Sequence, residues 1–213
     1  MQWLGREPIM RSRQRFVVVL VRCTVVSILA VGIAASITRQ AESLTGDAHH
    51  APEWVRMADG KLWNRRNLAV RIPGSFCYDD LDSNCGLFGR LYTWKAARQV
   101  CAKLGRRWRL PSDSDWRQMA LHYGGIVSDA SDRGASAYAA LMIGGPSRFS
   151  AVLGGGREPD GRFERANAHG FYWSASRSDP GSAWFYNFGI GSRLLNRHSG
   201  ETSSAFAVRC IKD

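Results

Sequence analysis

Motifs that mark several common protein classes are missing from this sequence. It has no G-x-S-x-G nucleophile motif, no glycine-rich loop followed by Lys-Ser or Lys-Thr, and no C-x-x-C pair. These absences argue against an α/β-hydrolase, a phosphate-binding loop and a zinc finger, respectively. No internal repeat with a period of about 20 to 50 residues is present, so a solenoid or propeller is not expected.

Acidic residues are scarce relative to basic ones. The 213 residues include 29 Lys and Arg against 18 Asp and Glu, for a formal net charge of +11. The first 36 residues contribute five arginines and one glutamate, which leaves about +7 on the rest of the chain. No basic run alternates with aromatic residues, so no nucleic-acid partner is expected. We interpret the charge as a solvated surface, with attraction to an acidic partner as the alternative.

The chain has one long hydrophobic run, over residues 16–35, and four arginines precede it. Arg22 interrupts the run, and the apolar stretch 25–35 ends in small residues up to Ser36 that suit a cleavage site. Residues 1–36 are therefore expected to be a signal peptide. An uncleaved membrane anchor is the alternative, although Arg22 within a membrane span would cost up to ~3 kcal/mol.

Both interpretations of this segment export the remainder of the chain, because positive charge stays on the cytoplasmic side. Membrane contact is expected only through residues 1–36, if they are not cleaved. The true start is either Met1 or Met10, and Met10 gives a signal of ordinary length. Residues 37–51 are polar and are expected to be a linker, and residues 52–213 a single folded domain.

Cysteines are few, and four remain once Cys23 is set aside. In an exported chain they predict two disulfides, with three possible connectivities. Cys77 and Cys85 flank a short acidic loop, Cys101 lies on a predicted helix, and Cys210 lies on the expected final strand. The favoured pairs are Cys77–Cys85 and Cys101–Cys210, and the longer loop would contribute ~4 to 5 kcal/mol in the chain-entropy model.

Sustained helical periodicity is rare, and two main helices are predicted. The first follows Thr93 and ends at Gly105, and the second follows Ser112 with Asp115 in a capping-box position. A short helix is also expected over 135–142. Strands or hairpins are predicted around Asp59-Gly60 and at 149–153, 161–163, 171–176, 183–188 and 205–211. The predicted fold class is α+β, with two main helices packed on irregular antiparallel β-sheets.

An ordered set of short motifs resembles a known family, the Fibrobacter succinogenes major paralogous domain, over roughly residues 54–213. The matching residues are Cys77-Tyr78-Asp79, Asn84-Cys85, 89–94, Ala97, Cys101, 109–112, Trp116, 149–151, 153–155, Trp173-Ser174 and 208–213. This resemblance implies a protein exported by bacteria, often to the cell surface, in a family mostly without an assigned activity. It also implies a C-type-lectin-like fold, in which a helix cysteine pairs with one in the last strand, as in Cys101–Cys210. One departure is Arg109, where members of the family commonly have histidine.

Two acidic segments are candidate calcium sites. Asp80, Asp82 and Asn84 alternate in a manner slightly similar to a cation loop, but the glycine and distal glutamate of an EF-hand are absent. Glu158-Pro159-Asp160 resembles the Glu-Pro-Asn motif of sugar-binding C-type lectins, yet a β-turn with proline in its second position explains it better. We therefore expect no cofactor, with calcium at Asp80, Asp82 and Asn84 as a weak alternative.

The aromatic C-terminal third holds the residues expected to contact a ligand: Trp184, Tyr186, Asn187 and Arg193. Exposed aromatic rings stack on sugars or anchor protein partners, and arginine complements anionic groups. The predicted function is an exported, non-catalytic binding or adhesion module for a glycan or an extracellular protein. The alternatives are a structural envelope protein without its own ligand site, and an oxidoreductase of the formylglycine-generating type. That enzyme would need Cys101 and Cys210 as free thiols.

Overall fold

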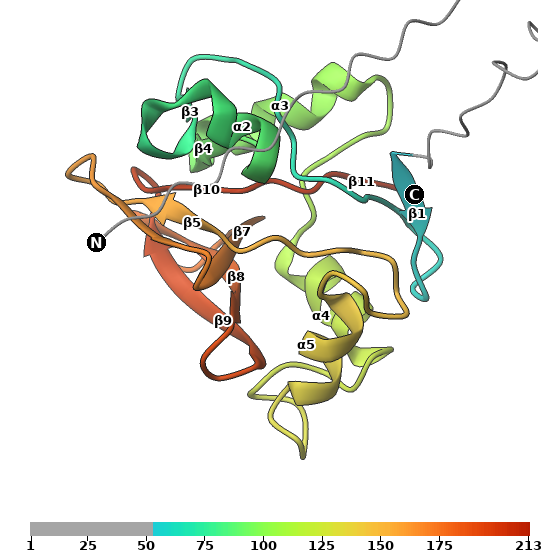
Figure 1. Cartoon of the computed structure of the whole chain (residues 1–213). Helices are drawn as coiled ribbons and strands as arrows, with labels where there is room; N and C mark the ends of the chain where they lie inside the picture. The colour runs from blue at the N-terminus through green and yellow to red at the C-terminus, as the bar shows by residue number, and fades with distance from the viewer. Residues whose placement is uncertain (1–52) are drawn as a thin grey trace, which may run out of the picture. The chain divides into compact units, whose positions relative to one another are not determined.

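The computed structural model describes residues 53–213, which form an α+β domain (Figure 1). Four α-helices lie in this part of the chain: α2 (Asp82–Phe88), α3 (Trp94–Val100), α4 (Asp113–Leu121) and α5 (Ala135–Leu141). Two 3-10 helices, η1 (Tyr78–Asp80) and η2 (Cys101–Leu104), accompany them. None of the helices described here is long and apolar enough to cross a membrane.

Eleven strands form two sheets. They are β1 (Trp54–Arg56), β2 (Leu62–Asn64), β3 (Ser75–Phe76), β4 (Leu91–Thr93), β5 (Gly154–Arg157), β6 (Phe163–Ala166), β7 (His169–Arg177), β8 (Ser182–Gly189), β9 (Leu194–Glu201), β10 (Ala205–Phe206) and β11 (Ile211–Lys212). The smaller sheet has the order β1-β2-β11, and the larger one β3-β4-β10-β5-β7-β8-β9, with β6 paired to β5. The pair β5–β7 is parallel, and the remaining named strand pairs are antiparallel.

Both faces of the long strands β7 and β8 are buried. Because successive side chains of a strand point to opposite faces, alternate residues enter different cores. Tyr172, Tyr186 and Phe188 pack with α4 and α5 in one cluster, whereas Trp173 and Phe185 pack against α3 in the other. In Figure 1, α2 and α3 accordingly lie on one side of the path through β10 and β11, and α4 and α5 on the other.

The predicted helix caps are confirmed. Thr93 accepts a hydrogen bond from the backbone of Ala96 at the start of α3, and the 3-10 helix η2 extends that helix to Gly105. At the start of α4, Ser112 and Asp115 form the full capping box. Desolvation alone would raise the pKa of Asp115, but hydrogen bonds from Arg109, Ser112 and Lys61 outweigh it and hold this pKa well below its ordinary value.

The structure differs from the sequence prediction in several segments. Residues 149–153 contain an isolated bridge rather than a strand, and the strand β5 begins at the glycines that follow. The acidic stretch between Cys77 and Cys85 contains η1 and the start of helix α2 instead of a loop alone, and the strands β3, β4 and β9 were not predicted. The closing run 205–211 is divided into two short strands on different sheets. In each case the tertiary environment of the backbone, rather than local propensity, determined the outcome.

A buried arginine explains two of these differences. Arg209 is fully enclosed, and its guanidinium donates to Asn67 Oδ1 (2.7 Å) and to the backbone oxygens of Asn64 (2.8 Å), Phe149 (2.7 Å) and Ser150 (2.8 Å). The guanidinium carbon Cζ of Arg209 also lies 4.5 Å from the centroid of the Phe149 ring. In a strand at 149–153, the carbonyls of Phe149 and Ser150 would accept hydrogen bonds from a neighbouring strand. Here they accept hydrogen bonds from Arg209 instead. The run 205–211 is likewise interrupted over residues 207–210, which include Arg209.

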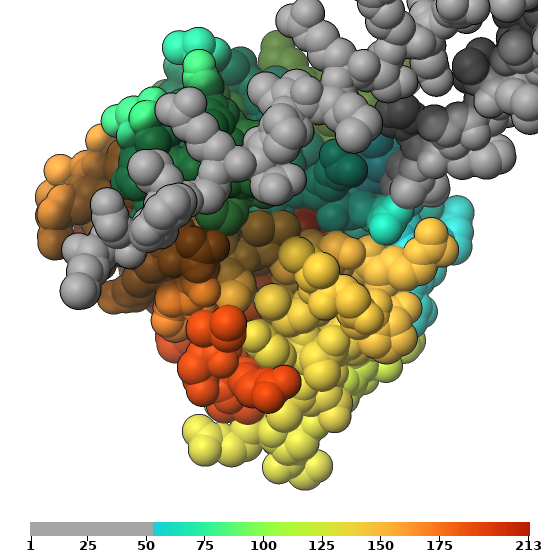
Figure 2. All heavy atoms as spheres, viewed as in Figure 1, coloured from blue at the N-terminus to red at the C-terminus, as the bar shows by residue number. Residues whose placement is uncertain are grey.

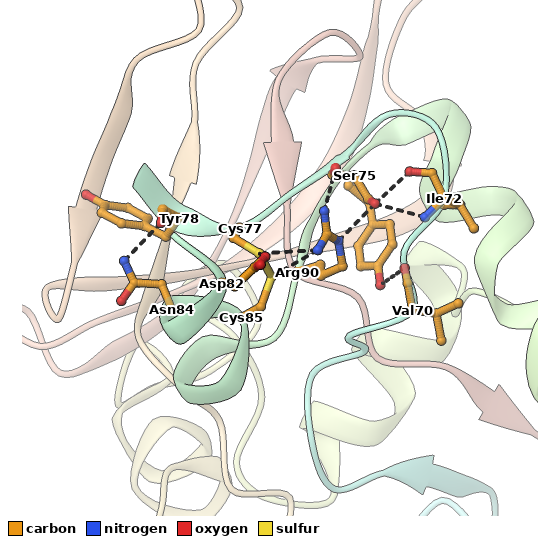
Figure 3. Close-up of a disulfide and its surroundings, with 10 residues drawn as sticks. Val70, Ile72, Ser75, Cys77, Tyr78, Asp82, Asn84, Cys85 and Arg90 are labelled. Carbon is orange, nitrogen blue, oxygen red and sulfur yellow. Dashed lines mark hydrogen bonds between the residues drawn. A yellow bond between two sulfur atoms is a disulfide. The ribbon is translucent and has the colours of Figure 1, made fainter. Parts of the chain in front are cut away.

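Two disulfides join the predicted pairs, Cys77–Cys85 and Cys101–Cys210. Figure 3 shows the first pair beside Arg90, whose Nη1 lies 3.2 Å and 3.3 Å from the two sulfur atoms. The same guanidinium donates to Ser75 O (2.9 Å) and Ser75 Oγ (3.0 Å), so the loop is fastened to strand β3. The second disulfide connects Cys101, at the end of α3, to Cys210, the residue before the last strand β11.

We expect the two disulfides to contribute unequally to stability. They close loops with sequence separations of 8 and 109 residues. The chain-entropy model gives about 2 to 3 kcal/mol for the shorter loop and ~4 to 5 kcal/mol for the longer one. The double variant Cys101→Ala/Cys210→Ala should therefore lose more unfolding free energy in urea than Cys77→Ala/Cys85→Ala. An equal or smaller loss would contradict this assignment of the stabilising loop.

Replacement of Arg209 should be among the most destabilising single changes. Arg209→Met removes the guanidinium donor from four oxygen acceptors, three of them in buried hydrogen bonds, and we expect a loss of about 3 kcal/mol or more of unfolding free energy. Arg66→Met is the matched control, because Arg66 is exposed and its loss should change stability by less than about 0.5 kcal/mol. Urea unfolding followed by tryptophan fluorescence measures both. Similar midpoints for the two variants would contradict the role given to Arg209.

Candidate functional site

A cleft of about 610 Å³ opens between the β5–β6 hairpin and the end of β9. This volume lies within the range of ligand sites, about 300 to 1,000 Å³. Five parts of the chain contribute to it: the β5–β6 turn, β6, β7, β8 and the segment from β9 to β10. The lining residues are Glu158, Pro159, Asp160, Arg162, Glu164, Arg165, Phe171, Phe185, Ser199, Gly200, Glu201, Ser204 and Phe206.

Three phenylalanine rings form the floor of the cleft. Phe206 lies 5.2 Å from Phe171 and 4.7 Å from Phe185 between ring centroids. These phenylalanines are at most 9% exposed, so each presents only a small part of its surface to solvent. Glycine is required beneath them, because a Cβ at Gly156 would lie 2.8 Å from Phe206, and one at Gly200 would lie 2.9 Å from Phe185. The floor is thus a tightly packed extension of the core.

The rim on the hairpin side is ionic. A β-turn over 158–161 is closed by a hydrogen bond from Gly161 N to Glu158 O (2.9 Å), which agrees with the turn expected there. Arg162 bridges Asp160 (2.7 Å) and Glu164 (2.9 Å). Hydrogen bonds from the backbone and the guanidinium of Arg162 hold the pKa of Asp160 below its ordinary value. Asp160 therefore remains a charged acceptor at neutral pH.

Two further carboxylates have no cationic partner within residues 53–213. Glu158 is half-buried at the start of the turn, and Glu201 is exposed at the end of β9. Glu201 accepts a hydrogen bond from the Ser203 hydroxyl (3.5 Å). Their remaining lone pairs are free to accept hydrogen bonds from hydroxyl or amide groups of a ligand. An apolar floor with a few polar groups at the rim is the usual composition of a ligand site.

The model of one protein family, the Fibrobacter succinogenes major domain, matches residues 56–212. The chain belongs to this family. No curated protein and no solved structure matches the chain. The earlier resemblance to the Fibrobacter succinogenes major paralogous domain is therefore confirmed over nearly the whole described region.

Several residues of the motifs that signalled the Fibrobacter succinogenes major domain lie in its core. Trp116, Trp173 and Arg209 are fully buried, and Cys101 pairs with Cys210. All of the cleft residues lie outside those motifs. This explains why sequence reasoning found the family and missed the cleft. The alternation of residues in β7 and β8 would have placed Phe171 and Phe185 on a common face, but nothing local indicates the hairpin that walls the cleft.

Arg109, which stands where family members commonly have histidine, has a structural role. Its guanidinium pairs with Asp115 (2.6 Å) and Asp213 (3.0 Å). The hydrogen bond with Asp115 is the main reason that the pKa of Arg109 lies above its ordinary value. The side chain thus fastens the start of α4 to the C-terminal residue.

The four predicted contact residues are not brought together. Trp184 is half-buried and covered by the Arg197 guanidinium, 4.0 Å from its ring centroid, and Arg197 is itself paired with Asp113 (2.7 Å). Asn187 lies on the opposite face of β8, which also carries Phe185. Its Oδ1 is 3.0 Å from His169 Nδ1. Trp184 and Asn187 therefore face different sides of the sheet.

Tyr186 requires a correction. It is fully buried, its ring stacks on Trp116 at 4.8 Å, and its hydroxyl donates to Asp113 Oδ1 (2.9 Å). Burial, with the nearby charge of Asp113, raises the pKa of Tyr186 well above its ordinary value. A side chain enclosed in this way does not belong to a solvent-facing contact surface.

Arg193 lines a different depression, of about 940 Å³, between α5 and the β8–β9 turn. Figure 2 shows this turn, in orange-red, beside the yellow segment that includes α5. The exposed side chains Ile143 and Ile190 give the depression an apolar lining. It shares no lining residue with the first cleft.

The proposed calcium ligands also make contacts of other kinds. Asn84 Nδ2 donates to Tyr78 O (2.9 Å), and Asp82 Oδ1 lies 3.5 Å from Cys77 Sγ. Within residues 53–213, no three acidic, histidine or cysteine side chains gather as a metal site would require. The thiols on which the oxidoreductase alternative depends, Cys101 and Cys210, are joined in a disulfide.

Loss of the Tyr186 hydroxyl should affect stability. Tyr186→Phe removes the hydrogen bond to Asp113 and leaves the stacked ring in place, so we expect a loss of about 1 kcal/mol of unfolding free energy. Tyr123→Phe is the control, because the Tyr123 hydroxyl makes no hydrogen bond within the described residues. Thermal unfolding followed by circular dichroism measures both. If Tyr186→Phe is as stable as the control, the hydroxyl has no structural role.

Proposed function

We propose that this chain is an exported, non-catalytic binding module with a C-type-lectin-like fold. Its ligand is a glycan or an extracellular protein, held in the cleft between the β5–β6 hairpin and β9. The observation that carries this proposal is the combination of an apolar floor with carboxylates at the rim. Aromatic rings contact the apolar faces of sugars or side chains, and carboxylates accept hydrogen bonds from hydroxyl groups.

Two features support the fold and the location. A cysteine at the end of helix α3 pairs with one beside the last strand, as the C-type-lectin arrangement requires. Two structural disulfides indicate an oxidising compartment outside the cytoplasm. Secretion through the N-terminal segment is part of the proposal, and that segment lies outside the described residues.

The carboxylates without cationic partners provide the test. We expect the full chain to retain at least one oligosaccharide on an array of neutral and acidic glycans. The double variant Glu158→Gln/Glu201→Gln should bind that glycan about tenfold or more weakly, because hydrogen bonds to charged groups contribute about 1.5 to 3 kcal/mol. Titration calorimetry with the retained glycan gives the affinities.

Glu53→Gln is the matched control, since Glu53 is exposed and does not line the cleft. It should leave the affinity unchanged. Equal affinity of the double variant and the control would remove the cleft from the binding site. If the array retains nothing, the same chain is used to capture envelope proteins, and retention sensitive to Glu158→Gln/Glu201→Gln would assign a protein ligand. Failure of both would favour a structural envelope protein without its own ligand site.

A further inference from the structure

A second cleft, of about 550 Å³, lies beside helix α3 and carries a different charge. Its lining residues are Trp94, Lys95, Arg98 and Gln99 of α3, Arg177 at the end of β7, and Thr202 after β9. Three of these six side chains are cationic, and none is acidic. The turn after β9 separates it from the first cleft, whose lining includes Glu201 and Ser204.

Two arginines share one indole ring in this cleft. The guanidinium carbons of Arg98 and Arg177 lie 4.9 Å and 4.7 Å from the centroid of Trp94. The ring is fixed, because Trp94 is 4% exposed and its Nε1 donates to Ser174 O (2.8 Å). Cation–π attraction therefore holds both guanidinium groups at the Trp94 ring. Lys95 adds a third positive charge to the same opening.

These cations have no carboxylate partner within residues 53–213. Lys95, Arg98 and Arg177 are all exposed and take part in none of the ion pairs, in contrast to Arg162 of the first cleft, which is paired twice. Arg177 donates one hydrogen bond, to the backbone oxygen of Pro180. The other guanidinium N–H groups remain available, and paired N–H donors suit the oxygens of a carboxylate, sulfate or phosphate.

The composition of the opening favours a sugar-borne anion over a membrane surface. The large exposed apolar side chains of the described region, Trp54, Leu81, Leu87, Leu121, Ile143 and Ile190, all lie elsewhere. Gln99 and Thr202 instead supply amide and hydroxyl groups, which hydrogen-bond to sugar hydroxyls. The site is concave as well, whereas attachment to a lipid surface needs an outward-facing apolar or basic face.

We propose that this cleft binds an anionic sugar unit of an acidic polysaccharide, with Arg98 and Arg177 contacting its carboxylate, sulfate or phosphate group. This site is separate from the cleft of the proposed function, and its occupation does not depend on that function. The net positive charge of the chain would then attract the polymer, and the cleft would select for a charged sugar.

Affinity chromatography and calorimetry with dextran sulfate test the proposal, with neutral dextran as the reference polymer. The full chain should bind dextran sulfate and not dextran. Arg98→Gln/Arg177→Gln should weaken this binding about tenfold or more and reduce its dependence on salt concentration. Lys95→Gln, a single exposed substitution, should weaken it in the same direction. Circular dichroism checks that each variant is folded.

Arg106→Gln/Arg107→Gln is the matched control, because it removes the same charge from two exposed arginines beyond the other end of α3–η2. It should retain nearly the full affinity for dextran sulfate. Equal weakening by the two double variants would overturn the proposal, since it would reduce the effect to net charge. Binding to vesicles of anionic phospholipid that depends on Arg98 and Arg177, without binding to dextran sulfate, would assign the cleft to a lipid headgroup and also overturn it.

Discussion

The hydrogen bonds of one buried guanidinium constrain much of this fold. Arg209 forms no ion pair with any carboxylate of residues 53–213, so its burial requires a set of well-placed oxygen acceptors. These come from residues 64–67 and 149–150, which are far apart in the sequence. The neighbouring Cys210 is fixed in turn, because its backbone N–H donates a hydrogen bond to Asn64 Oδ1 (3.0 Å) and its sulfur forms the disulfide to Cys101. Four segments therefore meet at adjacent residues of the chain.

The position of the first cleft follows from this constraint. Because the carbonyls of Phe149 and Ser150 accept hydrogen bonds from Arg209, strand β5 begins only at Gly154. Strand β5 then pairs with β6 to make the hairpin that walls the cleft, and with β7 and β10, which supply two rings of its floor. Gly156 allows these rings to approach the strand closely. The cleft thus depends on contacts that lie well outside it.

The burial of both faces of β7 and β8 limits where a ligand can bind. With one core on each face, the long strands have little side-chain surface left to offer, and the openings lie at their ends and edges. The two clefts on either side of the turn after β9 differ in charge pattern. The first combines acidic groups with paired arginines, and the second holds cations alone. Two neighbouring clefts of this kind can contact different parts of one ligand. The charge of each part then determines which cleft it enters.

The sequence by itself determined the family, the α+β class, the helix caps and the disulfide pairs. These rest on local chemistry, such as the capping box of Ser112 and Asp115, or on a motif whose members form the core. The tertiary structure alone decided that 149–153 is not a strand, that Tyr186 is enclosed, and which side chains line the clefts. The physical reason is that a cleft joins residues from separate strands and turns. Their proximity is set by long-range pairing and by the acceptors that Arg209 requires, which leave no periodic trace in the sequence.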